Sequence, residues 1–81
     1  MTLRRSARLL FSMPGTHNRS QIWEMRTDGA GLRQVTPGDE PDVDNYDACY
    51  LPGGRIGYAP WQGGFNVGFR GVLADAGEGS P

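Results

Sequence analysis

The stretch that decides the fold is residues 21–36, which read QIWEMRTDGAGLRQVT. Residues 21–26 alternate in type as a half-buried β-strand does. Residues 27–31 then supply an Asp-Gly turn, because glycine accepts the positive φ that tight turns demand. Residues 32–36 are a second strand-like run, which ends at Pro37. The stretch therefore predicts an antiparallel hairpin with a bulged turn or a turn of about four or five residues.

Strand-like runs recur on both sides of this hairpin, and turns rich in glycine or proline separate them. Pro14-Gly15 ends one run. Pro52-Gly53-Gly54 joins two others, with proline pre-setting φ and glycine supplying the left-handed position. No segment shows helical periodicity over about ten residues. The sequence therefore predicts an all-β fold of antiparallel strands, at residues 8–13, 21–26, 32–36, 47–51, 55–59 and 67–73.

The composition excludes several classes of protein. Thirteen glycines and six prolines approach the level of low-complexity sequence, but two Trp, three Tyr and three Phe are too many aromatic residues for a disordered linker. A net charge of −1 gives no basic footprint, so no nucleic-acid partner is predicted. A run of about 18 apolar residues is absent, so no membrane span is predicted. One cysteine cannot make an internal disulfide framework or a multi-cysteine zinc site.

Charge is unevenly distributed along the 81 residues. Residues 1–33 hold six arginines and two acids, a net charge of +4, whereas residues 34–81 hold two arginines and seven acids, a net charge of −5. The two halves can attract each other or face different neighbours. The alternative is that these charged residues lie on solvated strand edges and loops, where their attraction contributes little to stability.

The chain also aligns with itself at an offset of 47 residues. Residues 8–12 then fall on residues 55–59, and Met25 falls on Val72. A period of about 40–50 residues with several strands per unit is typical of a β-propeller, in which each blade is a small twisted antiparallel sheet. A blade cannot bury its two faces alone. We therefore expect one incomplete blade and part of a second blade, as a fragment of a larger propeller.

This interpretation divides the chain into four parts. They are an N-terminal tail at residues 1–6, three strands of one blade at residues 7–36, an acidic inter-blade loop at residues 37–46, and a partial second blade with a Gly-rich, divergent end at residues 47–81.

Two stretches resemble a known family. Residues 21–36 resemble the TolB-type, WD-repeat-like propeller unit, which reads as an aliphatic-aromatic strand followed by Met, Asp-Gly and Arg-Gln-Leu-Thr. Residues 47–56 resemble its other half, a strand with Trp-Ser-Pro-Asp-Gly before a basic residue and Ile. Tyr50-Leu51-Pro52, preceded by residues 44–47, is similar to a variant in proteins like the middle domain of the hydrazine synthase alpha-subunit. Gly53 stands where the family has Asp, and the match after residue 59 is poor.

The resemblance implies a function, because TolB-like propellers mostly act as binding platforms. The chain is then a non-catalytic scaffold or interaction platform whose partners are the remaining blades and other proteins. The resemblance also implies a periplasmic or extracytoplasmic location, although no signal peptide is visible: the apolar residues 9–11 are far fewer than the roughly 7–15 required. The alternatives are a propeller portion of a multihaem redox subunit or of a propeller-gated serine peptidase. In both, the chemistry lies outside this chain, because Cys49 is not part of a Cys-x-x-Cys-His haem motif and no Gly-x-Ser-x-Gly motif occurs.

The acidic run supplies a candidate metal site. Asp42, Asp44 and Asp47 carry carboxylates that can converge on a calcium ion, which takes six to eight oxygen ligands. The spacing fails the EF-hand pattern. The alternative interpretation is a solvated inter-blade loop in which Asp47 caps the strand turn.

Aromatic residues supply the other candidates. Trp61 and Phe65, in a Gly-rich loop, are the candidate binding surface, because aromatic side chains anchor many interfaces. Trp23 is assigned to the core between blades, and Cys49 is expected to be a buried small hydrophobe. His17 is expected to be an exposed loop residue. No catalytic residues are evident in the chain.

Overall fold

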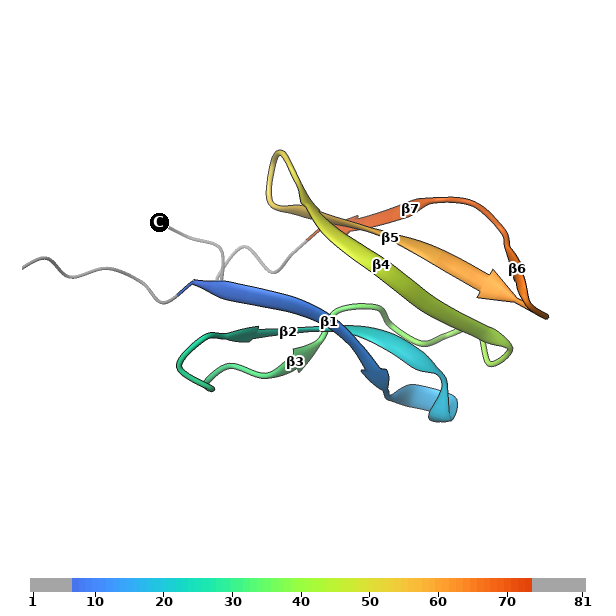
Figure 1. Ribbon diagram of the computed structural model, residues 1–81, viewed down its shortest axis with the longest axis horizontal. Coiled ribbons are helices and arrows are strands. Elements are labelled where there is room, and N and C mark those ends of the chain that lie inside the picture. The colour runs from blue at the N-terminus through green and yellow to red at the C-terminus, as the bar shows by residue number, and fades with distance from the viewer. Residues whose placement is uncertain (1–6, 74–81) are drawn as a thin grey trace, which may run out of the picture.

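The computed structural model describes residues 7–73, which form two antiparallel β-sheets (Figure 1). The first sheet has the order β1-β2-β3, and a single 3₁₀ turn, η1, joins its first two strands. The elements are β1 (Arg8–Pro14), η1 (Thr16–Asn18), β2 (Ser20–Arg26) and β3 (Arg33–Gln34). Within residues 7–73, no helix has the length and apolar character that a membrane crossing requires.

The second sheet is built around a long central strand, β5. β4 pairs with β5 along its length, whereas β6 and β7 pair with successive parts of β5. The elements are β4 (Val43–Leu51), β5 (Arg55–Gln62), β6 (Phe65–Asn66) and β7 (Arg70–Leu73). The prediction of an all-β fold with antiparallel strands is confirmed for the described residues.

One strand boundary differs clearly from the prediction. β4 begins at Val43, so residues 43–46 of the predicted acidic loop belong to a strand. Val43 and Asn45 are buried while Asp44 and Tyr46 alternate with them on the other side. The acidic residues concealed this alternation in the sequence, because the pairing of Asp44 with Arg19, in the turn before β2, cannot be seen there.

The third strand of the second sheet is interrupted. Residues 67–73 were expected to form one strand, but pairing with β5 stops between β6 and β7, where Gly68 has a φ of 135°. β5 itself continues through Pro60, one residue beyond the predicted end at residue 59, and ends at Gln62. Proline has no N–H to donate to a neighbouring strand, which makes it rare inside a sheet. The interruption lies beside Pro60, whose carbonyl accepts the N–H of Val67 at 2.9 Å.

The two sheets repeat the same strand register. Leu9 pairs with Met25 in the first sheet and Ile56 pairs with Val72 in the second. Both members of the second pair lie 47 residues after their counterparts in the first. The β1–β2 hairpin and the β5–β7 pairing therefore have the same register at the offset predicted from the sequence.

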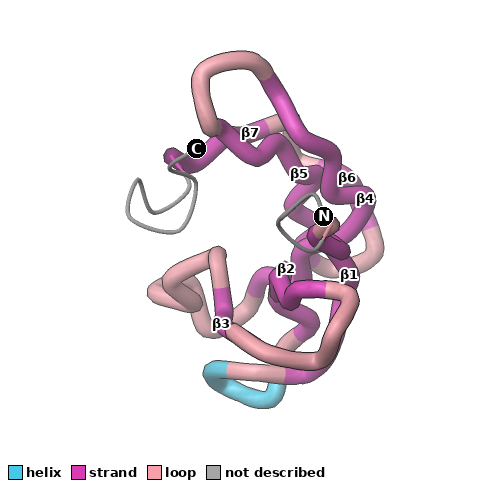
Figure 2. The backbone as a smooth tube through the Cα atoms, turned by 90° about the vertical axis from the view of Figure 1, so that its left-hand side faces the viewer, coloured by secondary structure: helices cyan, strands magenta, loops and turns pink. Residues whose placement is uncertain are grey.

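The core lies between the sheets, around Ile22, Ile56 and Tyr58. Leu10, Val35, Ala48 and Val72 pack against these three residues. β4 contacts both β1 and β2, whereas the β3 and β7 edges lie further apart in the end-on view (Figure 2). The two sheets are therefore arranged as a wedge that is narrow at β1 and β4.

A buried polar network joins the same two sheets. The amide oxygen of Gln21 accepts hydrogen bonds from the Thr36 hydroxyl at 2.6 Å and from the Asn45 side-chain nitrogen at 3.1 Å. The Thr36 hydroxyl also accepts the backbone N–H of Ile22. Buried polar groups cost free energy unless they are paired, so this network fixes the relative position of β2 and β4.

Candidate functional site

Trp61 lines a shallow pocket on the second sheet. The pocket has a volume of about 320 Å³ and is lined by Tyr46, Asp47 and Trp61. Tyr46 and Trp61 share one face because Tyr46 pairs with Ala59 and Trp61 lies two residues further along β5. The indole Nε1 of Trp61 is buried and makes no hydrogen bond. The structure thus places the sequence-predicted Trp61 beside two residues that had not been assigned to a binding surface.

Asp47 reaches this pocket because β4 is bulged there. The pairing of β4 with β5 shifts between Tyr46 and Cys49, and Asp47 has a positive φ of 57°. A bulge redirects a side chain out of the regular alternation of a strand. This bulge could not be predicted from the sequence, because Asp is common in ordinary turns as well.

Phe65, the other predicted binding residue, does not line the pocket. It lies in β6, next to the Gly63-Gly64 turn, and 75% of its surface is exposed. Phe65 and the pocket therefore form two separate apolar features at the same end of β5.

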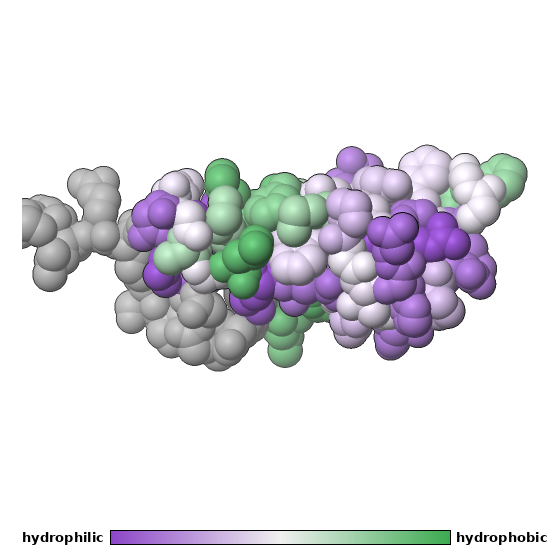
Figure 3. All heavy atoms as spheres, turned by 90° about the horizontal axis from the view of Figure 1, so that it is seen from below, coloured by the Kyte–Doolittle hydropathy of each residue, from purple (hydrophilic) through white to green (hydrophobic). Residues whose placement is uncertain are grey.

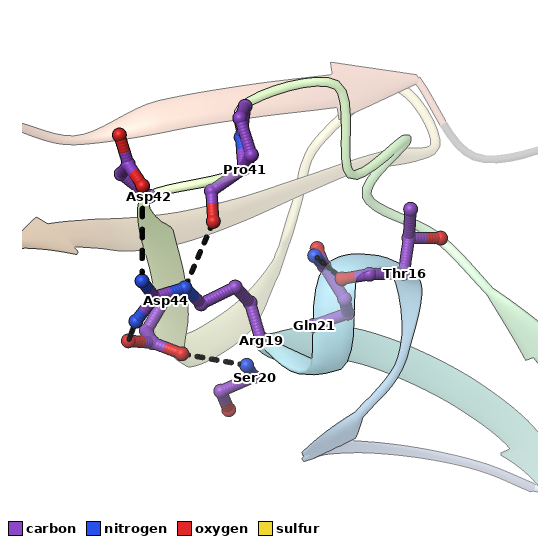
Figure 4. A network of polar contacts seen from close by, with 7 residues as sticks. All are labelled: Thr16, Arg19, Ser20, Gln21, Pro41, Asp42 and Asp44. Carbon is purple, nitrogen blue, oxygen red and sulfur yellow. Dashed lines mark hydrogen bonds and ion pairs between the residues drawn. The ribbon is translucent and has the colours of Figure 1, made fainter.

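The predicted metal ligands Asp42 and Asp44 both face Arg19 (Figure 4). Arg19 lies 3.3 Å from Asp44 and 3.8 Å from Asp42, and its Nε donates to the carbonyl of Pro41 at 2.8 Å. Asp44 also accepts the backbone N–H of Ser20 at 2.7 Å. These contacts tie the turn before β2 to the start of β4.

The structure does not bring Asp47 to this cluster. Asp47 lines the Trp61 pocket instead, whereas Asp42 and Asp44 share a guanidinium as counter-ion. Within residues 7–73, no three His, Cys, Asp or Glu side chains are grouped in a way that could hold a metal ion. A calcium titration tests the candidate site at the three aspartates.

A charged cluster that the sequence did not predict lies between the sheets. The buried Glu24 pairs with Arg33 at 2.9 Å and with Arg8 at 3.9 Å, and it accepts a hydrogen bond from the Tyr50 hydroxyl at 2.9 Å. Burial, the hydrogen bond to Glu24 and the charge of that carboxylate together raise the pKa of Tyr50 to about 12. In the sequence, this cluster was indicated only by Glu24, a charged residue between the apolar residues Trp23 and Met25 of β2.

The outward face of the first sheet is apolar. Leu10, Ser12, Ile22 and Glu24 contact the second sheet, so the apolar residues that alternate with them in β1 and in the later part of β2 point away from it. Leu9 is 46% exposed, and the other members of this face are half-buried. Figure 3, viewed from the side of the first sheet, shows hydrophobic residues gathered in the middle of the molecule. This first outer face comprises Leu9, Phe11, Met13, Trp23 and Met25.

The outward face of the second sheet contains small residues and exposed apolar ones. Ile56, Tyr58 and Val72 point to the first sheet, so their neighbours point away. The ring of Phe69 lies over Gly57, where an added Cβ would collide with it, and Phe69 is still 61% exposed. This second outer face comprises Tyr46, Gly57, Ala59, Phe69, Gly71 and the Trp61 pocket.

Three further expectations about single residues have different outcomes. Trp23 lies on the first outer face, away from the core that the two sheets share, and its Nε1 donates to the Met13 carbonyl at 3.1 Å. Cys49 lies in β4 as expected, but it is exposed, so the expectation of a buried cysteine is wrong. The register shift of the bulge between Tyr46 and Cys49 changes which side chains of β4 are buried, and the expectation did not include this shift. His17 is exposed, in the η1 turn with a φ of 61°.

Comparisons of the chain with models of protein families, with curated proteins and with solved structures found no match.

Proposed function

We propose that this chain contributes parts of two successive blades to a TolB-type β-propeller that serves as a non-catalytic interaction platform. The observation that carries the proposal is the strand register that repeats after 47 residues, from the Leu9–Met25 pair to the Ile56–Val72 pair. A register that recurs at the length of one blade is what a propeller repeat requires.

The direction of the repeat adds support. Leu9 and Met25 point away from the second sheet, whereas their counterparts Ile56 and Val72 point toward the first sheet. Equivalent faces of the two sheets therefore point in the same direction, so that the outer face of the first sheet corresponds to the inner face of the second. Such head-to-tail contacts close into a ring when the rotation between neighbours allows it, as in a propeller. A sandwich with two-fold symmetry would instead bring equivalent faces together.

The wedge between the sheets agrees with neighbouring blades that radiate from an axis near β1 and β4 (Figure 2). Both outer faces then receive further blades, which are the partners expected from the resemblance. A blade depends on its neighbours to bury its faces. The exposure of Leu9 and Phe69, at 46% and 61%, is accounted for in this way.

The interaction surface in this proposal is the end of the wedge at which η1, residues 37–42 and the Gly63-Gly64 turn lie (Figure 1). Arg19 holds the first two of these segments together through Pro41 and Asp44. Loops that a rigid sheet positions are the usual place for binding residues. The exposed Phe65, beside the Gly63-Gly64 turn, lies at this end.

The blade assignment is tested by reading the DNA on both sides of the coding sequence in all frames. We expect further units of strand, Pro-Gly turn, strand and Asp-Gly turn at a spacing of about 47 residues. A Cys-x-x-Cys-His motif there assigns the platform to a haem protein, and a Gly-x-Ser-x-Gly motif assigns it to a peptidase. If no propeller-like unit occurs in any flanking frame, the proposal is wrong.

The platform role is tested in the full polypeptide with photo-reactive residues at two positions. At Phe65 the probe should cross-link to a different protein, whereas at Phe69, on the second outer face, it should cross-link within the polypeptide to another blade. If the probes at both positions cross-link to the same blade, the end of the wedge at Phe65 is not an interaction surface for other proteins.

A further inference from the structure

The Trp61 pocket combines two aromatic rings with a carboxylate that has no counter-charge. Its volume of about 320 Å³ lies at the small end of the range for ligand sites, roughly 300–1,000 Å³, and its lining is Tyr46, Asp47 and Trp61. Asp47 makes no ion pair with another residue of the described range 7–73. The pocket therefore places an unused negative charge beside the surface of aromatic rings.

Trp61 offers carbon atoms, rather than its N–H, to a ligand. The side chain is half-buried, and its Nε1 is buried without a hydrogen-bond partner in the described part of the chain. A buried donor without an acceptor is uncommon in folded proteins, because it destabilises them. The accessible part of the indole is therefore its carbon surface, which is apolar and electron-rich at the ring face.

Asp47, rather than Asp44, supplies the charge of the pocket. Asp44 is the cross-strand partner of Trp61, but Arg19 lies 3.3 Å from its carboxylate and the Ser20 N–H donates to it at 2.7 Å. Asp47 reaches the pocket through the bulge in β4, with a φ of 57°. One carboxylate is too few ligands for calcium, which takes about six to eight oxygens. The charge therefore favours an organic cation.

The lining also distinguishes between kinds of organic cation. A primary ammonium is strongly hydrated and has three N–H donors, for which the pocket offers a single carboxylate. A trimethylammonium group has no N–H donor, and it binds the faces of Trp and Tyr rings through the cation–π interaction. Trp61 and Tyr46 supply such rings, and Asp47 balances the charge. The lining therefore fits a trimethylammonium group better than an unmodified lysine.

A neighbouring blade on the second outer face leaves this pocket accessible. Pro14 lies 47 residues before Trp61, on the side of β1 that faces the second sheet. Leu10, on the same side, packs against the core, whereas Pro14 is exposed although the second sheet is in place. The second sheet thus does not cover the first sheet at this end of β1. By the same repeat, a following blade should not cover Trp61.

We propose that the Trp61 pocket binds a trimethylammonium group, with Trp61 and Tyr46 against the cation and Asp47 as its counter-charge. The inference goes beyond the proposed function, because the three residues belong to one sheet of this chain and need no other blade to form the site. Two sources carry this group: a free quaternary amine such as choline, and a trimethylated lysine of another protein.

Ligand-observed NMR of the 81-residue chain tests the proposal, with choline as the probe and saturation transfer to its N-methyl protons as the signal. Choline should bind in the millimolar range. Its neutral isostere, in which carbon replaces the nitrogen, should bind at least about threefold more weakly, because it lacks the charge. Equal binding of the two compounds, or no saturation transfer to choline, would overturn the proposal.

Substitutions locate the site. Trp61→Leu keeps an apolar side chain but removes the ring, and it should weaken choline binding about fivefold or more. Asp47→Asn removes the charge but keeps a residue that tolerates a positive φ, and it should weaken binding about threefold. Phe69→Leu and Asp28→Asn, at an exposed aromatic and an exposed acid outside the pocket, are the matched controls and should bind choline normally. Trp61→Leu and Asp47→Asn variants that bind as tightly as these controls would show the proposal to be wrong.

Far-UV circular dichroism checks the fold of each variant. If Trp61→Leu unfolds, Trp61→Phe takes its place and should weaken binding by a smaller factor, because Phe binds cations less well than Trp. A peptide with one trimethyllysine then distinguishes the two sources. Tighter binding of this peptide than of choline and of the unmethylated peptide supports the site with a protein partner, and tighter binding of choline supports it with a free amine. An unmethylated peptide that binds as tightly as the methylated peptide and choline would overturn the preference for the methylated cation.

The failure of this inference and the failure of the proposed function are distinguishable. A folded chain that does not bind choline overturns the site and leaves the blade assignment standing. Missing repeats in the flanking reading frames overturn the blade assignment, while choline binding to the chain remains measurable.

Discussion

Glu24 carries a carboxylate into the interface between the sheets, where only 4% of its side chain is exposed. Arg33 at 2.9 Å and the Tyr50 hydroxyl at 2.9 Å are its nearest partners. Charges at such depth are tolerated only when they are paired and hydrogen-bonded. The cluster therefore holds the sheets in one relative position.

We predict that Glu24→Gln destabilises the chain by roughly 3 kcal/mol, because it leaves Arg33 without its counter-charge. Tyr50→Phe, which removes one hydrogen bond and leaves the ion pair, should cost about 1 kcal/mol. Urea denaturation followed by circular dichroism measures both. Equal losses for the two variants would show that the ion pair adds nothing to the hydrogen bond.

Tyr50 also predicts a pH dependence. Its pKa in the folded chain, about 12, lies above the ordinary value of 10.0. The neutral phenol is therefore favoured in the folded state, so this stability is fully present below pH 10.0 and is lost as the pH rises toward about 12. The fall in melting temperature over this range should be larger in the unmodified chain than in Tyr50→Phe. Burial also raises the pKa of Tyr58. The difference in melting temperature between the unmodified chain and Tyr50→Phe therefore separates the contribution of Tyr50 from that of Tyr58.

At the scale of the elements, the interruption between β6 and β7 depends on one glycine. Gly68 has a φ of 135°, a conformation that residues with a Cβ rarely adopt. We predict that Gly68→Ala destabilises the second sheet by at least about 1 kcal/mol. Gly71→Ala, in the adjoining strand β7, is the control, because Gly71 has no positive φ and the nearest atom to an added Cβ lies 3.4 Å away. Similar melting temperatures for the two variants would contradict the role assigned to Gly68.

The start of β4 gives a second prediction at this scale. Asp44 binds both Arg19 and the Ser20 N–H, whereas Asp42, with 75% of its side chain exposed, contacts Arg19 only at 3.8 Å. Asp44→Ala should therefore cost about 1 kcal/mol, and Asp42→Ala less than about 0.5 kcal/mol. Because Arg19 already neutralises both carboxylates, we expect millimolar calcium to leave the melting temperature unchanged. A rise with calcium that Asp44→Ala abolishes would establish the cation site instead.

Alternation at residues 21–26 and the Gly/Pro turns that bound the other apolar runs sufficed to predict β1, β2 and most of β5. The prediction failed at residues 43–46, where the strand contains Asp44, whose partner Arg19 lies in the distant turn before β2. The pocket at Trp61 could be predicted only in part. Tyr46 and Asp47 join it through strand pairing and a bulge, neither of which a single-chain pattern specifies.

At the scale of the whole molecule, stability should depend on what covers the two outer faces, which expose Leu9 at 46% and Phe69 at 61%. A blade depends on its neighbours to bury its faces, and a neighbouring sheet that covers apolar surface only in the folded state stabilises that state. The melting temperature of the 81-residue chain should therefore lie below that of the same residues within a longer polypeptide that contains the flanking blades. Equal melting temperatures would argue that the outer faces remain exposed to solvent in both.

The positions of the two tryptophans have an optical consequence. Trp23 lies on the first outer face and Trp61 on the second, so each indole reports on one of the two faces. With Trp23→Phe, the remaining emission reports on the second outer face alone. With Trp61→Phe, it reports on the first outer face alone. A blue shift in one variant, as water leaves the ring, would identify which outer face a partner covers, without any attached label.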